Sequence, residues 1–197
     1  MNIMMDYIAS MVIFGILTLT IARVQGNINT TLYLNTQSII VQGSATSFAR
    51  QIEWDFLKIG HRTVGQKIFY ADSVKLVFKG DLENRYVQDS ITYTIGNTSN
   101  ATDTFNPRDF PLYRYMGATA LRQNFGLVEF KLSYIDSAYN PIAMPINTTS
   151  QCVLIRGINL YFKVESAEPT VTPFDTLWAA ISWQKLMFPR NLNSLYY

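Results

Sequence analysis

The sequence predicts an α+β fold in which one long N-terminal helix packs on a mostly antiparallel β-sheet. Two observations support this prediction. Apolar residues follow a helical pattern to about residue 60, and from Lys67 onward the period of the pattern changes to two. A chain of 197 residues is long enough for one domain and an appended element. We therefore expect a single β-rich head on a helical stalk.

The first element, residues 1–26, is predicted to be an apolar transmembrane helix. Sixteen uncharged residues separate Asp6 from Arg23, and a helix over residues 1–22 would span about 33 Å, enough to cross a hydrocarbon core. A cleaved secretory signal has a positively charged start, whereas this segment carries an acid. We therefore expect the helix to be retained.

Asp6 is unusual in this segment, because an ionised carboxylate among apolar residues is costly unless it is paired. The nearest cations in the sequence are the α-amino group and Arg23, and Arg23 lies about 25 Å away along a helix. A cationic partner from another copy of the chain is more plausible than an intrachain one. The alternative is that Asp6 lies in water at the membrane interface.

Residues 27–60 are predicted to form the rest of the stalk. The junction carries Gly26, Asn27 and Asn29, which are weak helix formers, so this polar stretch is expected to melt in part. Beyond it, apolar residues at i, i+3, i+4 and i+7 predict an amphipathic helix with one face on the head: these are Ala45, Phe48, Ala49, Ile52, Phe56 and Ile59. Gly60 is the expected end of the helix.

Residues 61–197 are predicted to form the β-rich head. The β-rich runs are separated by Gly, Asn, Asp and Pro clusters and cover 67–70, 73–79, 86–95, 112–115, 126–136, 152–166 and 177–187. Segments 97–111 and 137–151 are rich in Asn, Thr and Pro, so we expect exposed loops there. Four aromatic residues at strand spacing, Tyr161, Phe162, Trp178 and Trp183, are predicted to form core and cross-strand pairs rather than a sugar-stacking platform.

The composition argues against an enzyme and against nucleic acid as a partner. Charged residues make up 15% of the chain and the net charge is +2, against an average of about 25% charged residues. One cysteine and one histidine exclude an internal disulfide and a Cys/His zinc cluster. We predict no catalytic, cofactor or metal site.

The few side chains that could take part in catalysis or binding have simpler structural explanations. Glu53 and Asp55 lie two residues apart on a helix and so point to different faces, which suits a solvated surface. His61 has no carboxylate nearby to orient it. Cys152 is expected to be a small buried hydrophobe at the start of a strand, with intermolecular cross-linking as the alternative. The sequons at Asn29, Asn97, Asn100 and Asn147 are candidate glycosylation sites, although an Asn- and Thr-rich chain produces such matches by chance.

The N-terminal pattern resembles that of the type IV pilin and type II secretion pseudopilin superfamily. Asp6 is followed nine residues later by Gly15, Ile16 and Leu17, as in the signature of that superfamily. The larger pseudopilin and minor-pilin branch shares further pieces in the same order: FARQIEWDFLKIGHR, ITYTIG, LYRYMG with ALRQ, FGLVEFKLSYID, LIRGINLYFKVESAEP and PRNL. The family normally has Glu where this chain has Asp6. It also normally has a basic leader that ends in Gly before a Phe or Met, and this sequence shows no such segment. If Met1 is the first mature residue, Asp6 stands one position late for the family; if Met1 is lost, the register of Asp6 and Gly15 fits.

The resemblance implies a pilin-like fold and a function. It implies a structural subunit that waits in the inner membrane at an assembly platform and is then extracted into an extracellular, homo-oligomeric helical filament. Asp6, Gly15, Ile16 and Leu17 would be assembly residues, the acid neutralising the N-terminal amine of a neighbour. The alternatives are a minor tip pilin or pseudopilin that primes a secretion or pilus machine, and a single-pass anchored binding module.

Overall fold

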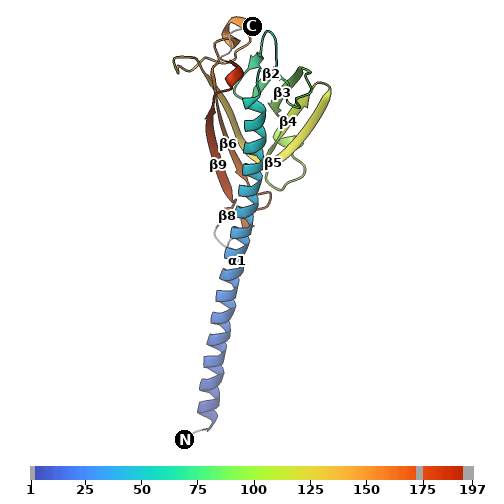
Figure 1. The fold of residues 1–197 in the computed structure, drawn as a ribbon. Coiled ribbons are helices and arrows are strands. Elements are labelled where there is room, and N and C mark those ends of the chain that lie inside the picture. Colours follow the sequence, from blue (N-terminus) through green and yellow to red (C-terminus); the bar gives the residue numbers. More distant parts are fainter. Residues whose placement is uncertain (1–2, 172–174, 193–197) are drawn as a thin grey trace.

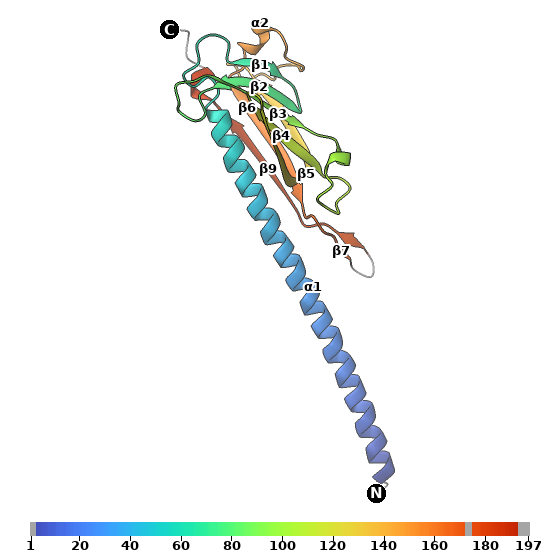
Figure 2. The same ribbon diagram turned by 90° about the vertical axis from the view of Figure 1, so that its right-hand side faces the viewer.

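The protein is a long helix that carries a β-rich head at its C-terminal half (Figure 1). The computed structural model describes residues 3–171 and 175–192. Helix α1 runs from Ile3 to Leu57, 55 residues, which corresponds to about 82 Å. Its N-terminal half projects from the head, and its C-terminal half lies against the sheet (Figures 1 and 2).

The head is built on a seven-stranded antiparallel sheet in the order β1-β2-β3-β4-β5-β6-β9. Its strands are β1 (Ile68–Ala71), β2 (Lys75–Gly80), β3 (Asp89–Ile95), β4 (Phe110–Met116), β5 (Thr119–Ile135), β6 (Gly157–Glu165) and β9 (Ala180–Met187). Strands β7 (Thr170–Val171) and β8 (Thr176–Leu177) form a small separate hairpin. Three short helices, η1 (Thr98–Asn100), α2 (Thr149–Cys152) and η2 (Arg190–Leu192), complete the described chain. The α+β prediction is confirmed.

The sheet curls around α1 because β5 bends in its middle. The first part of β5 pairs with β4 and the second part with β6, so the two ends of the sheet lie on either side of the helix (Figure 1). Gly126 lies at the bend with φ +72°, and a Cβ at this position would collide with the carbonyl oxygen of Glu165. Only glycine allows both the left-handed backbone and this close approach.

The structure moves several boundaries that the sequence predicts. The α-helix ends at Leu57, and Gly60, with φ +74°, donates its N–H to Lys79 O at 2.8 Å, so it leads the chain into the sheet after a turn. Strand β5 starts at Thr119 rather than at residue 126. Cys152 is buried as expected but ends α2 instead of starting a strand, because Thr148 caps that helix by accepting the N–H of Gln151.

The core lies between the C-terminal half of α1 and the concave face of the sheet. The buried apolar face of α1 carries Val41, Ala45, Phe48, Ala49, Ile52 and Phe56. The ring of Phe48 meets that of Phe162 edge-on at 4.7 Å, and Phe162 stacks on its cross-strand partner Trp183 at 5.2 Å. The prediction that these two aromatics form a core pair is confirmed, and the amphipathic half of the stalk is fixed on the head.

Asp55 corrects the prediction of a solvated surface. It is 3% exposed and accepts hydrogen bonds from the Tyr93 hydroxyl and from Arg114 Nε at 2.6 Å. Burial raises the pKa of Tyr93 well above its usual range, and the Asp55 carboxylate adds to the effect. Glu53, by contrast, forms a partly exposed ion pair with Lys185 of β9. The curl of the sheet covers a wider arc of α1 than its apolar stripe alone indicates.

Replacing Asp55 with Ala should destabilise the head strongly. The Arg114 guanidinium, whose side chain is 16% exposed, would lose its only ion-pair partner among the described residues, and stranding a buried charge in this way costs about 3 to 5 kcal/mol. Unfolding in urea followed by near-ultraviolet circular dichroism measures this loss. Glu53→Gln is the matched control on the same helix and should cost at most about 1 kcal/mol. Equal losses in the two variants would contradict a special role for Asp55.

Candidate assembly and membrane surface

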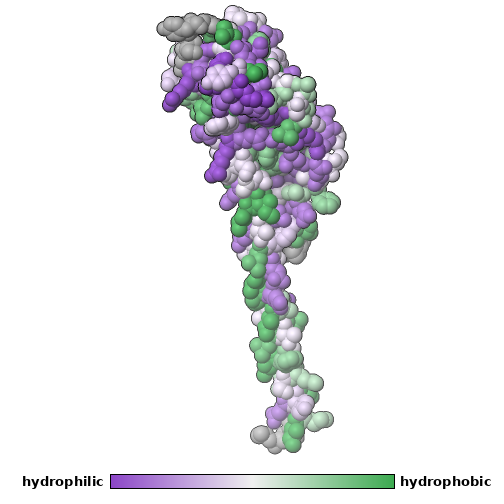
Figure 3. All heavy atoms as spheres, turned by 45° about the vertical axis from the view of Figure 1, so that its right-hand side comes forward, coloured by the Kyte–Doolittle hydropathy of each residue, from purple (hydrophilic) through white to green (hydrophobic). Residues whose placement is uncertain are grey.

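The N-terminal half of α1 is an exposed apolar surface. Going along the described part of α1, the first buried side chain is Val41. Ile3, Phe14 and Ile39 are 79%, 72% and 69% exposed, and apolar atoms cover much of the stalk (Figure 3). An 18-residue window in this helix has a mean hydropathy of 1.9, and none of it is buried within the structure. By length and composition this helix is able to cross a membrane.

The predicted assembly residues all lie on this surface but do not form a site within one chain. Asp6 is in the first turn of α1 and forms no ion pair with any residue that the structure describes. Gly15 is about 13.5 Å further along the axis and, nine residues on, faces the opposite side of the helix. Leu17 returns to the face of Asp6, since eleven residues complete about three turns.

Three glycines in α1 have no explanation inside the chain. A Cβ at Gly15, Gly26 or Gly43 would meet nothing within 4 Å, although a glycine inside a helix costs up to about 1 kcal/mol relative to alanine. The helix nevertheless runs unbroken through Gly26, Asn27 and Asn29. The hydroxyls of Thr30 and Thr31 donate hydrogen bonds to the carbonyl oxygens of Gly26 and Asn27. The partial melting of this stretch stays a prediction for the assembled state.

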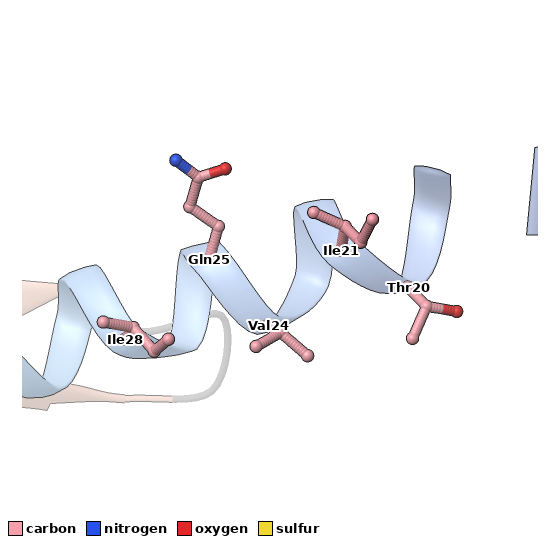
Figure 4. Close-up of a pocket in the computed structure, with 5 residues that line it drawn as sticks. All are labelled: Thr20, Ile21, Val24, Gln25 and Ile28. Carbon is pink, nitrogen blue, oxygen red and sulfur yellow. The ribbon is translucent and has the colours of Figure 1, made fainter. Parts of the chain in front are cut away.

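The exposed stalk carries a shallow, open hollow between its side chains. Thr20, Ile21, Val24, Gln25 and Ile28 line it, and all five come from successive turns of one helix (Figure 4). A binding cavity needs walls from more than one element. The hollow is therefore a gap between neighbouring side chains, of the kind that a side chain from another helix fills.

The remaining candidate groups are spread over the head. His61 lies in the turn after α1, and the structure describes no group of three or more His, Cys, Asp or Glu side chains that would hold a metal ion. Burial raises the pKa of the Cys152 thiol. The sequon residues Asn97 and Asn100 are exposed at η1, and Asn147 is exposed just before α2. Asn29 is exposed on the stalk.

Two buried acids lie close together in the head. Asp109 comes from segment 97–111, which the sequence predicts to be an exposed loop, and Glu165 ends strand β6. Glu165 is 4% exposed and is neutralised by Arg108 at 2.7 Å and Lys163 at 3.0 Å. Asp109 is fully buried without an ion pair among the described residues. Burial, with a smaller contribution from the Glu165 carboxylate, raises the pKa of the Asp109 carboxyl from its ordinary 3.8 to about 6, against the opposing effects of Thr104 and Arg108.

Comparisons of this chain with protein-family models, with curated proteins and with solved structures find no match. The fold and the exposed stalk are therefore the basis for any functional conclusion.

The buried Asp109 should make the head less stable as the pH rises. The pKa of Asp109 is higher in the folded state than in the unfolded state. The free energy of unfolding therefore carries no penalty from Asp109 below about pH 4, and it falls as the pH rises through about 6 because the buried carboxyl must then ionise. Asp109→Asn should therefore raise the free energy of unfolding by about 2 to 3 kcal/mol at pH 7.5 and by much less at pH 4. Thermal unfolding at the two pH values measures the difference.

Asp103→Asn is the control for this measurement. The Arg122 guanidinium lowers the pKa of the exposed Asp103 carboxyl, so its removal should give no stabilisation that grows with pH. If Asp109→Asn changed the free energy of unfolding equally at both pH values, ionisation of Asp109 would not destabilise the folded head, and the prediction would be wrong.

Removal of residues 1–26 should yield a soluble, monomeric head. Every described side chain that the deletion removes is exposed, whereas the buried face of α1 begins at Val41. The thermal unfolding midpoint of the truncated chain should match that of the full chain in detergent, and size-exclusion chromatography with light scattering should report one copy. An insoluble or obligately oligomeric product would place the boundary between stalk and head elsewhere.

Proposed function

We propose that this chain is a structural subunit of an extracellular helical filament of the type IV pilus kind, assembled by packing of the N-terminal helices. The observation that carries the proposal is the length of α1 over which large apolar side chains are exposed. From Ile3 to Ile40, just before the buried face begins, such side chains recur over about 57 Å of helix. A hydrocarbon core is about 30 Å thick, so a membrane covers only part of it.

The part beyond a membrane has the pattern of a helix-packing seam. Val24, Ile28, Leu32 and Ile39 are all at least half exposed. Their spacing of four, four and seven residues places them on one face of α1. A helix that only anchors the head in a membrane does not need apolar side chains in the part that lies outside the membrane, where they would be exposed to water. Packing it against other copies removes it from water, and each large apolar side chain so buried contributes about 1.5 to 3 kcal/mol.

A membrane and a filament core would surround the stalk one after the other. The subunit first lies in the inner membrane, where Asp6 at the end of the helix reaches the interface. It is then extracted into a filament, where Asp6 enters an apolar core and needs a cation. The N-terminal amine of a neighbouring subunit supplies that charge, since Asp6 pairs with no described residue of its own chain. The open glycine positions on α1 allow close approach of neighbouring helices.

Asp6→Ala tests the proposal. The substituted chain should remain in the membrane fraction, but the yield of filaments sheared from the cell surface and counted in electron micrographs should fall at least about tenfold. An unpaired amine in an apolar core costs several kcal/mol, which exceeds the 1.4 kcal/mol of a tenfold change. Asp6→Glu is the control, because it keeps the charge. Normal filament yield from Asp6→Ala, or no filaments from the unaltered chain, would contradict the proposal.

A further inference from the structure

Helix α1 ends in the head, at the far end of the molecule from the start of the stalk (Figure 1). Two exposed aromatic side chains lie near this end of the helix. Trp54 on α1 is 60% exposed and Tyr86, in the loop between β2 and β3, is 83% exposed. Each ring has a cation over it. Lys58 Nζ lies 4.5 Å from the centroid of the Trp54 ring, and the Arg62 guanidinium lies 4.0 Å from that of Tyr86. Because both rings remain mostly in solvent, each keeps area for a ligand.

The backbone around these rings is held in an unfavourable conformation. Four non-glycine residues in the described chain have positive φ, and three of them, Arg62 (52°), Asn84 (56°) and Tyr86 (62°), are in this one place. The left-handed region is disfavoured for residues with a Cβ, above all for bulky ones. Such conformations persist only where the surroundings impose them, and they cluster at ligand-binding sites.

A buried carboxylate imposes this conformation. Asp81 is fully buried and accepts the backbone N–H groups of Arg85 and Tyr86 at 2.8 and 2.9 Å. It also accepts Arg62 Nη1 at 3.1 Å. These three bonds hold Tyr86 and its stacked guanidinium in place. The loop is therefore fixed before any ligand arrives.

Lys58 joins the second ring to the same loop. Its Nζ donates to Leu82 O at 2.7 Å and to Asn84 Oδ1 at 3.3 Å while it lies over Trp54. Trp54 and Tyr86 are therefore linked through Lys58 and the loop that carries Asn84. We call this group of residues the aromatic platform: Trp54, Lys58, Arg62, Asn84 and Tyr86.

The charges of the platform favour a neutral ligand. Arg62 is paired with Asp81, Arg85 with Glu83, and Lys58 is directed to a carbonyl and an amide oxygen. Two of the three cations therefore have a carboxylate partner, and only Lys58, bonded to neutral oxygens, has none among the described residues. One unmatched charge is little for a polyanion to bind. Flat aromatic faces with amide and guanidinium donors beside them suit a ring that has C–H faces and hydroxyl edges.

We propose that the aromatic platform binds a neutral polysaccharide, with pyranose rings stacked on Trp54 and Tyr86 and hydroxyls bonded to Arg62 and Asn84. This activity is additional to filament assembly and does not depend on it. The orientation of the molecule agrees with it, because the platform lies away from the apolar half of α1, which is the part suited to a membrane.

Retention of the full chain on immobilised polysaccharides tests the proposal. The chain is solubilised in a detergent without a sugar headgroup and is applied to β-glucan, mannan and chitin, with heparin as an acidic comparison. We expect retention on at least one neutral polymer and none on heparin. Trp54→Ala and Tyr86→Ala should each lower the bound fraction about tenfold or more, whereas Tyr86→Phe keeps the ring and should bind normally.

Tyr139→Ala is the matched control, since Tyr139 is also 70% exposed and has positive φ but packs on Phe188. It should bind like the unaltered chain. Because the Ala variants can disturb the loop, a second readout uses the unaltered sequence: the polymer should change tryptophan emission, and Trp54→Phe should abolish that change. No retention on any neutral polymer, retention on heparin, or equal loss in Tyr139→Ala would overturn the proposal. So would a change of oligomeric state in Trp54→Ala with unchanged retention, which would identify a contact between copies.

Discussion

The structure depends on one constraint, which is that the chain cannot bury the apolar side chains of its own first 38 described residues. These residues, 3–40, include no buried side chain, while the head that follows them has a buried hydrophobic core. Hydrophobic burial is the largest favourable term in folding, so a surface of this size must be covered by lipid or by other copies. The glycines at positions 15, 26 and 43, which nothing in the chain requires, have the same explanation. The stalk is therefore built for contacts that lie outside a single chain.

The head meets the opposite requirement, because it must hold the same helix firmly. Phe48 and Phe162 supply apolar contact, and Asp55, Tyr93 and Arg114 form a buried polar network between α1 and the sheet. Such a network fixes the rotation and register of a helix more strictly than apolar packing alone. One helix thus has two halves with different tasks, and they meet near Val41. Force applied to the stalk would pass into the sheet through these contacts.

Part of this architecture could be read from the sequence, because it rests on local patterns. The helical spacing of Phe48, Ile52 and Phe56 and the change of period after residue 67 predict the helix and the sheet. The burial of Asp55 could not be predicted, because it follows from the curl of the sheet at Gly126, which depends on strand pairing far along the chain. The same holds for Tyr86, whose exposure depends on Asp81 and on Arg62 from another segment. The sequence does not predict α2, because the Thr148 cap that starts this helix is a single side-chain hydrogen bond.

A cryo-electron microscopy map of filaments sheared from the cell surface tests the central claim most directly. We expect this chain to be the repeating subunit, with residues 3–40 of neighbouring copies in contact at the centre and the heads outside. Asp6 should lie beside the N-terminal amine of an adjacent copy. Filaments that lack this chain, or a map in which α1 stays exposed along Val24, Ile28 and Leu32, would contradict the proposed assembly.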